Sequence, residues 1–293
     1  MEFLRPATWQ EALAAKAAHP DAVPLAGGTD LMVEINFDRR RPERLLDLSR
    51  VAELRDWGPE DGAVRLGARV PYRTVIERLG DELPALAVAA RTVGSPQIRN
   101  RATVAGNLGT ASPAGDAHPA LLAAGARVEV ASARGTRTIP IDAFYLGPKR
   151  NALAPDELIR AVLVERATGP QEFAKVGTRN AMVIAVCAVA VALRPDTRTV
   201  RTGLGSVAPT PRRAAEAEEF LTGVLAEGDH WTTGRPPPPA AAGRFAELVA
   251  AACSPIDDVR GSADYRRHAV RVLARRTLDR AWRARPRTEG ARA

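Results

Sequence analysis

Residues 25–31 read Leu25-Ala26-Gly27-Gly28-Thr29-Asp30-Leu31, and about eighty residues later residues 103–110 read Thr103-Val104-Ala105-Gly106-Asn107-Leu108-Gly109-Thr110. Each segment places glycines and hydroxyl side chains where the backbone must bend sharply and leave its N–H groups uncovered. Successive uncovered amides bind an anion without a lysine. The two segments therefore predict two loops that hold one diphosphate-containing dinucleotide from two sides.

Length and composition favour an ordinary globular protein. The 293 residues, 45% of them apolar, can bury one large core or two to three small ones. The N-terminal residues lack the basic and apolar regions of a secretion signal, and the longest apolar run, 181–193, is too short to span a bilayer. With only Cys187 and Cys253, the chain can form neither a disulfide framework nor its own iron–sulfur cluster. We expect a cytoplasmic protein with no membrane span and no metal ligands.

The positive charge raises the question of nucleic-acid binding. The net charge is +8, and all but three of the 42 basic residues are arginines. A nucleic-acid groove combines clustered basic residues with aromatic side chains for stacking, but aromatic residues make up only 4% of this chain. We therefore expect most arginines on helix surfaces and some against an acidic partner subunit, with nucleic-acid binding kept only as an alternative.

The first third of the sequence shows short alternating elements. The pattern predicts a helix over 6–18 and a strand over 22–26 that leads into the first glycine segment. Residues 31–35 fit strand and helix equally well. Strands at 45–48 and 64–68 and a helix at 71–79 follow.

Residues 92–116 form the centre of the second region. Glycines and prolines interrupt every periodic pattern there, and so long a segment without regular structure is usually functional. Asp116 can cap a short helix over 116–122, contact a ligand, or do both. Alternating residues then predict a hairpin of 127–130 with 137–141.

The third region contains a misleading glycine motif. Residues 203–208 match the G-x-G-x-x-A pattern of Rossmann dinucleotide-binding folds, which requires a helix to begin within it. Pro209 and Pro211 forbid that helix, so we reject a Rossmann site. The third region opens at residues 172–176 and runs to 208, with a possible strand just before the glycine motif. Its apolar run 181–193 fits a buried strand or a core helix.

The C-terminal part is predicted to be a loop followed by a helix. Residues 227–243, with four consecutive prolines, are interpreted as a solvated loop with little capacity to pack. Ser262 can cap a helix beyond it. The buried face of that helix is expected to comprise Tyr265, Ala269, Val272 and Leu273.

Motifs along nearly the whole chain, taken in order, resemble the FAD-binding medium subunit of molybdenum hydroxylases, the family of the carbon monoxide dehydrogenase and xanthine dehydrogenase flavoproteins. The residues that carry this resemblance are Ala26 to Leu31, Thr103 to Asn107, Thr110 to Pro113, Asp116, Phe173 to Lys175, Arg179, Val207 to Arg212 and Arg260 to Arg267. One departure is Ala105, because the family commonly has a glycine pair before the asparagine. This difference concerns the local shape of the second loop.

The resemblance implies an α+β fold of the vanillyl-alcohol oxidase-like (PCMH) type, in which two subdomains hold FAD, followed by a CO dehydrogenase flavoprotein-like C-terminal domain. It implies FAD-binding subdomains at 1–55 and 56–168 and a C-terminal domain at 169–282 that contains the Pro-rich loop 227–243. A disordered tail is expected at 283–293.

The resemblance also implies which residues contact FAD. The diphosphate would lie against the amides of 27–31 and near Gly106 and Asn107, and Asp116 would accept a sugar or ribityl hydroxyl. Ile159 and Lys175 match positions that contact the cofactor in relatives. Instead of contacting FAD, Ile159 could simply pack in the core and Lys175 could be a surface charge. The expected contacts are Leu25, Ala26, Gly27, Gly28, Thr29, Asp30, Leu31, Ala102, Thr103, Gly106, Asn107, Gly109, Thr110, Gly115, Asp116, Ile159 and Lys175.

The implied function is electron transfer within a hetero-oligomer. A molybdenum cofactor would sit on a large subunit and [2Fe–2S] clusters on a small one, while FAD on this chain would pass electrons to NAD, a quinone or oxygen. Because the flavin carries the chemistry, no catalytic residue is expected here. The alternative is a self-sufficient FAD-dependent oxidoreductase that acts directly on a small molecule.

Overall fold

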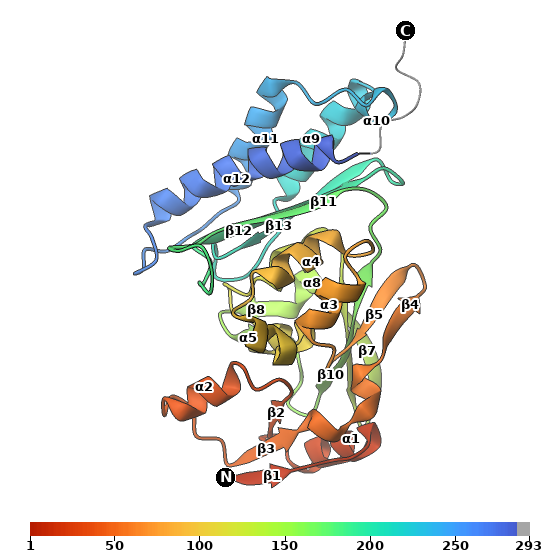
Figure 1. Ribbon diagram of the computed structural model, residues 1–293, viewed down its shortest axis with the longest axis vertical. Coiled ribbons are helices and arrows are strands. Elements are labelled where there is room, and N and C mark those ends of the chain that lie inside the picture. The colour runs from red at the N-terminus through yellow and green to blue at the C-terminus, as the bar shows by residue number, and fades with distance from the viewer. Residues whose placement is uncertain (286–293) are drawn as a thin grey trace.

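The structure, a computed structural model, describes residues 1–285 (Figure 1). Residues 286–293 of the predicted tail lie outside the described residues. Helix α12 (Ala263–Arg283) ends at Arg283, the residue at which that tail was expected to start. Just beyond it, the guanidinium of Arg285 lies 4.3 Å from the ring centroid of Trp282. Among residues 1–285, no helix combines the length and apolar composition needed to cross a bilayer.

The N-terminal layer is a small parallel sheet with two helices. Its strands are ordered β1 (Glu2–Leu4), β3 (Arg44–Asp47) and β2 (Val23–Leu25), and β2 leads into the first glycine segment as predicted. The predicted first helix is α1 (Trp9–Ala18), which buries Trp9 and Leu13. Residues 31–35, which fitted strand or helix, are helical in α2 (Leu31–Asn36).

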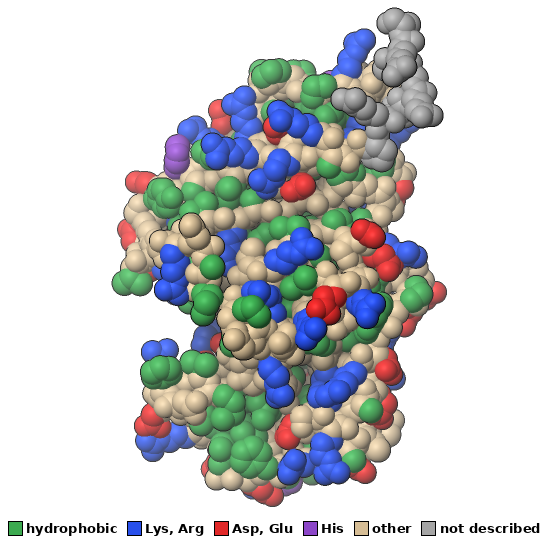
Figure 2. Space-filling view, viewed as in Figure 1, with side chains coloured by type: hydrophobic (Ala, Val, Ile, Leu, Met, Phe, Trp, Pro, Cys, Tyr) green, Lys and Arg blue, Asp and Glu red, His purple; other side chains and the backbone are tan. Residues whose placement is uncertain are grey.

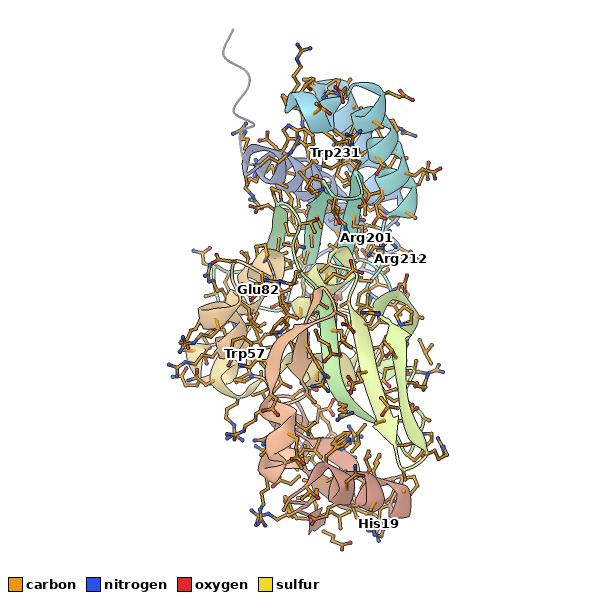
Figure 3. The ribbon with its side chains drawn as sticks, turned by 90° about the vertical axis from the view of Figure 1, so that its right-hand side faces the viewer. His19, Trp57, Glu82, Arg201, Arg212 and Trp231 are labelled. Carbon is orange, nitrogen blue, oxygen red and sulfur yellow. The ribbon has the colours of Figure 1, made fainter. Side chains whose placement is uncertain are left out.

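The central layer is a five-stranded antiparallel sheet, whose broad face is seen in Figure 3. It contains the predicted strand at 64–68 and the predicted hairpin of 127–130 with 137–141. Its strand order is β4 (Trp57–Glu60), β5 (Ala63–Gly67), β10 (Leu158–Glu165), β6 (Arg127–Ser132) and β7 (Gly135–Pro140). The short elements η1 (Leu48–Arg50), η2 (Ala52–Arg55), α3 (Tyr72–Arg78), α8 (Ile141–Phe144), β8 (Tyr145–Gly147) and β9 (Arg150–Asn151) complete this part of the chain.

Residues 92–116 are not irregular, and that prediction is wrong. Helices α4 (Pro84–Arg91), α5 (Pro96–Arg101), α6 (Val104–Thr110) and α7 (Ala117–Ala123) occupy or flank the segment. Ser95 caps α5 by accepting from the Ile98 amide, and Thr103 caps α6 by accepting from the Gly106 amide. A side-chain cap stabilises a helix by about 1 kcal/mol, which offsets one interior glycine of similar cost.

The third layer is an antiparallel sheet of β11 (Gln171–Val176), β12 (Cys187–Arg194) and β13 (Thr199–Gly205). The apolar run that fitted strand or helix is therefore a strand over its second half. Alternate residues of β12 enter different cores. Ala188, Ala190 and Ala192 pack with the N-terminal core, whereas Cys187, Val189, Val191 and Leu193 pack with the C-terminal one. Helices α4 and α7 cover the first face, and α9 (Ala215–Glu227) and α12 cover the second (Figure 1). Helix α11 (Pro239–Ala251) packs on α9 and α12.

The glycines of the rejected Rossmann motif serve packing. Residues 199–205 form strand β13, and no helix begins within the motif, which confirms the rejection. A Cβ atom at Gly203 would lie 1.9 Å from the carbonyl oxygen of Pro119 in α7. Glycine is therefore required because the sheet and α7 are in backbone contact.

The predicted loop at 227–243 is wrong over most of its length. Helix α9 reaches Glu227, α10 (His230–Thr233) follows, and α11 begins at Pro239. Trp231 is buried, and Pro239 is the first residue of α11, a position where proline favours a helix. Within this segment, only Gly228, Asp229 and residues 234–238 lie outside a helix.

Helix α12 begins as predicted, with the Ser262 hydroxyl accepting from the Tyr265 amide, but its buried face is rotated. Tyr265 is 48% exposed, and Val270 is buried in place of Val272. Arg266 also faces inward and is only 2% exposed. Its guanidinium donates to the carbonyls of Val186 and Ser206 and pairs with Asp258, so the buried charge is fully engaged.

Candidate functional site

The two glycine-bearing segments are in backbone contact. A Cβ atom at Gly27 would lie 2.1 Å from the carbonyl oxygen of Arg101 and 3.1 Å from Cα of Ala102. Only glycine fits there, because a methyl group would overlap the backbone that leads into α6. Gly28 has a positive φ of 76°, a conformation that glycine adopts without strain.

The first segment presents uncovered amides, as predicted. Within residues 1–285, no group accepts a hydrogen bond from the backbone N–H of any residue from 27 to 31. The next amide, that of Met32, donates to the carbonyl of Gly28. A turn with several free N–H groups on one side forms a concavity for an anion.

The second segment differs from the prediction because it is a helix rather than a loop. The Gly106 amide donates to Oγ1 of Thr103 at 2.9 Å, and the Asn107 amide donates to the carbonyl of Thr103 at 3.1 Å. These two amides are therefore not free to hold a diphosphate. Ala105 is helical without a positive φ, so its methyl group carries no left-handed strain and needs no glycine.

Helix α6 brings several of the predicted residues together. Oγ1 of Thr110 donates to Oδ2 of Asp30 at 3.2 Å, which connects α6 to the start of α2. The Asn151 side chain donates to the carbonyl of Gly109 at 2.9 Å. A Cβ atom at Gly109 would lie 3.9 Å from Cδ1 of Ile159, which is 8% exposed. We call residues 27–31 together with 106–110 the glycine-turn site.

Asp116 and Lys175 form a buried ion pair. Nζ of Lys175 lies 2.7 Å from Oδ2 of Asp116 and also donates to the carbonyl of Thr92 at 3.2 Å. The side chains are only 11% and 7% exposed, so the surface-charge alternative for Lys175 is wrong. Asp116 precedes α7 but makes no side-chain capping bond. Burial raises the pKa of Asp116 above its usual range, and the Lys175 ammonium opposes that rise.

Four polar side-chain atoms near this pair are buried and have no partner among the described residues. They are Oδ1 of Asp116, Oδ1 of Asn107, Nε2 of His118 and the hydroxyl of Tyr72. A Cβ atom at Gly115 would lie 2.2 Å from Nε2 of His118 and 2.9 Å from Nδ2 of Asn107, so these side chains crowd one place. Because an unpartnered buried polar atom is costly, such a cluster indicates a polar ligand.

Sequence reasoning missed Tyr72, His118 and Tyr145. The hydroxyl of Tyr145 lies 2.9 Å from Nδ1 of His118, and burial lowers the pKa of His118 to about 3, so its ring is neutral. Only the position of His118, two residues after Asp116, could have drawn attention to it. The two tyrosines come from distant segments that carry no motif.

A cavity of about 420 Å³ adjoins Lys175. It lies between the turn that joins α4 to α5 and residues 177–183, and its lining includes Arg91, Arg99 and Arg179. Arg99 donates to the carbonyls of Val93 and Gly94. Figure 2 also shows the surface hollowed at the left between α2 and the part of the molecule above it. The predicted residues thus gather in two neighbouring places, the glycine-turn site and the Asp116–Lys175 pair.

Comparison with protein families agrees with this geometry. Residues 1–165 match the family model of the FAD binding domain in molybdopterin dehydrogenase, and residues 172–281 match that of the CO dehydrogenase flavoprotein C-terminal domain. The chain belongs to this flavoprotein family. The predicted family and the two-part fold are therefore confirmed.

Most of the chain is also similar to subunits of known enzymes. The nicotinate dehydrogenase FAD-subunit of Eubacterium barkeri is 35% identical over 76% of this chain and 80% of its own length. The carbon monoxide dehydrogenase medium chain of Hydrogenophaga pseudoflava is 32% identical over 89% of this chain and 90% of its own.

The same fold appears in solved structures. A carbon monoxide dehydrogenase structure from Hydrogenophaga pseudoflava, which lacks the Mo-pyranopterin moiety of the molybdenum cofactor, aligns with a TM-score of 0.88 at 30% identity and covers 98% of both chains. Quinoline 2-oxidoreductase from Pseudomonas putida 86 aligns with a TM-score of 0.86 at 25% identity, over 97% of both chains.

Proposed function

We propose that this chain is the FAD-carrying electron-transfer subunit of a cytoplasmic molybdenum hydroxylase. It would take electrons from an iron–sulfur subunit and pass them to a terminal acceptor. One observation carries the proposal: in the described part of the chain, the backbone N–H groups of residues 27–31 have no acceptor and lie beside a buried polar cluster. The similar proteins are named as FAD-subunits or medium chains of larger enzymes, which favours this role over a self-sufficient oxidoreductase.

The residues present fit FAD. The amides of residues 27–31 would hold the diphosphate, and the hydroxyls of Thr29 and Thr103 would add hydrogen bonds. Oδ2 of Asp116 is engaged by Lys175, whereas its Oδ1 has no partner within residues 1–285 and would accept a sugar or ribityl hydroxyl. Ile159 would offer apolar contact beside Gly109. We retain Leu25, Ala26, Ala102, Gly115 and the other predicted contacts as proposals. Gly106 and Asn107 would contact FAD through atoms other than their backbone N–H groups, which are already bonded within α6.

The chain's own residues position the cofactor rather than react. Bound FAD supplies one- and two-electron transfer, so this chain needs no nucleophile or general acid. The buried ion pair of Lys175 with Asp116 connects β11 to α7 and fixes the carboxylate toward the cluster. We further propose subdomains at 1–55 and 56–168 and a C-terminal domain at 169–282, with FAD held between the first two.

A glycine substitution tests the diphosphate assignment. In Gly27→Ala the added methyl must push the turn away from Arg101, so the amides of 27–31 leave their positions. We expect FAD content, measured by the flavin absorbance per chain after purification, to fall about tenfold or more, since 1.4 kcal/mol corresponds to a factor of ten. Gly58→Ala is the matched control, because a Cβ atom there meets nothing within 4 Å.

Circular dichroism of both variants separates lost binding from lost folding. A folded Gly27→Ala variant that keeps the flavin content of Gly58→Ala would contradict the assignment. Turnover of a small substrate by the purified chain without companions would instead support the self-sufficient oxidoreductase.

A further inference from the structure

The last described residue of the chain, Arg285, lies against two aromatic rings. Its guanidinium is 4.3 Å from the ring centroid of Trp282 on α12 and 5.3 Å from that of Trp231 on α10. The two indole rings are neighbours, with their centroids 5.9 Å apart. A cation is attracted by the negative face of an aromatic ring, and indole is the strongest aromatic partner. Arg285 therefore has two favourable partners at once.

Two backbone carbonyls complete the surroundings of the guanidinium. Nη1 of Arg285 donates to the carbonyl of His230 at 3.1 Å, and Nη2 donates to the carbonyl of Trp231 at 2.7 Å. These acceptors are consecutive residues of α10, 55 and 54 positions earlier in the sequence. A guanidinium presents its N–H groups as a rigid planar fork, which matches two neighbouring acceptors. The rings and carbonyls together therefore form a pocket that suits a guanidinium group.

Further contacts connect the same segment to α12. Nε1 of Trp282 donates to the carbonyl of Gly234 at 3.2 Å, and the ring of His230 meets the Trp282 ring edge-on, with centroids 6.3 Å apart. In Figure 1, α10 lies near the C-terminal end of α12. Trp231 is 7% exposed and Trp282 is 6% exposed. The contacts among α10, α12 and Arg285 thus keep both indole rings out of water.

The segment that Arg285 contacts has little stability of its own. Helix α10 has only 4 residues, and so short a helix is not stable without tertiary contacts. Asp229, directly before it, has a positive φ of 49°, a conformation that is unfavourable for most residues other than glycine. Residues 234–238, directly after it, include three prolines and lie outside a helix. Contacts from other parts of the chain must therefore hold this segment in place.

We infer that Trp231, Trp282 and the two α10 carbonyls form a guanidinium-binding pocket, and that Arg285 fills it as a latch. With the latch closed, residues 229–238 stay packed on α9 and α12. Without the guanidinium, this segment detaches and exposes both indole rings. Neither α10 nor α12 contains a residue that is expected to contact FAD, so the inference does not depend on the proposed function.

The latch sets a limit to shortening of the chain from its C-terminus. Removal of residues 286–293 leaves the Arg285 guanidinium in its pocket, whereas removal of one more residue empties the pocket. A carboxypeptidase that trims the chain would therefore leave α10 in place until it removes Arg285. Position 285 is thus the point at which trimming changes the structure.

Limited proteolysis of the full-length chain tests the latch. Chymotrypsin cleaves after large aromatic residues, and the fragment that ends at Trp231 is identified by its mass. We expect Arg285→Gln to raise the rate of this cleavage about tenfold or more, because proteolysis follows the population of the locally open form. Arg244→Gln is the matched control, since Arg244 pairs with Glu247 on the surface of α11, and its cleavage should stay at the wild-type rate.

Two shortened chains test the limit at position 285. A chain that ends at Arg285 should be cleaved after Trp231 as slowly as the wild type. A chain that ends at Ala284 should be cleaved as fast as Arg285→Gln, and its tryptophan emission should shift to longer wavelength as the rings become hydrated. Equal cleavage of the two shortened chains would overturn the inference, as would wild-type cleavage of Arg285→Gln. Cleavage spread over the whole chain would do the same, because the latch acts only on residues 229–238.

Free methylguanidinium tests the chemistry of the pocket. At millimolar concentration it should slow the cleavage of Arg285→Ala after Trp231, because the pocket of this variant is open to a cation from solution. Methylammonium at the same concentration should not, since it lacks the planar fork. The wild type shows whether either cation slows the protease itself. Equal effects of the two cations on Arg285→Ala would overturn the assignment of the pocket to a guanidinium group.

Discussion

His118 illustrates how one buried side chain completes the proposed site. Its Nδ1 lies 2.9 Å from the hydroxyl of Tyr145, and its Nε2 is buried without a partner among the described residues. Burial lowers the pKa of His118 to about 3, so the ring stays neutral under all ordinary conditions. In the tautomer that carries its proton on Nε2, the neutral ring would accept a hydrogen bond from Tyr145 at Nδ1 and could donate one from Nε2 to a ligand.

The pKa of His118 predicts a loss of stability in acid. Because the folded pKa is about 3 and the unfolded pKa is about 6.5, only the unfolded chain binds this proton between those values. Stability therefore falls as the pH falls through this window. Between pH 7 and pH 5 the wild type should lose about 2 kcal/mol more than His118→Gln, measured by urea unfolding. Equal losses in the two proteins would show that folding does not lower the pKa of His118.

At the residue scale, the sequence predicted those parts of the site that consist of consecutive residues. The glycine turn at Gly27 and Gly28 could be predicted because its chemistry lies within a few consecutive residues. The cluster of Tyr72, Asn107 and His118 could not, because long-range packing brings these side chains together. The pairing of Asp116 with Lys175 was also missed, although each was proposed separately as a cofactor contact.

Helix α12 shows what the element scale adds. Its first residue was predicted because Ser262 is a strong capping residue, and its hydroxyl accepts from the Tyr265 amide at 3.2 Å. Its buried face was predicted one step out of register, since Arg266 is buried by hydrogen bonds that no apolar pattern reveals. The strand β12 was left undecided because residues on both of its faces are apolar.

Removal of the cap on α12 should weaken the C-terminal core. Ser262→Ala leaves an amide of the first turn without its acceptor and should cost about 1 kcal/mol. In a chain of this size the thermal unfolding midpoint should fall by about 2 °C, measured by circular dichroism. Ser262→Asp keeps an acceptor oxygen and should retain the wild-type midpoint. A midpoint equally low in both variants would exclude capping as the cause.

At the scale of the whole molecule, the Lys175–Asp116 pair connects the third sheet to the rest of the chain. Lys175 lies on β11, Asp116 precedes α7, and the carbonyl of Thr92 follows α4. The fold itself was predictable because ordered motifs run along nearly the whole sequence. The helical nature of residues 96–110 was not, because capping at Ser95 and Thr103 outweighs the glycines that suggested a loop.

Breaking the pair on one side should destabilise the protein strongly. Lys175→Met leaves the Asp116 carboxylate buried without its cation, a change that typically costs about 3–5 kcal/mol. Lys175→Met combined with Asp116→Asn removes both charges and should recover most of that loss. Urea unfolding of the two single variants and the double variant measures the coupling. Additive losses would mean that the two groups do not interact.

The two faces of β12 have a consequence for how the chain is made. Helices α4 and α7 leave the ribosome well before residues 187–194, whose alanine-bearing face packs against them. Domains generally fold as units during synthesis, and an incomplete domain exposes apolar surface that is prone to aggregation. The apolar surface of α4 and α7 therefore stays exposed in the nascent chain until β12 has been translated. A gene truncated before Cys187 would leave that side open permanently and yield a product prone to aggregation.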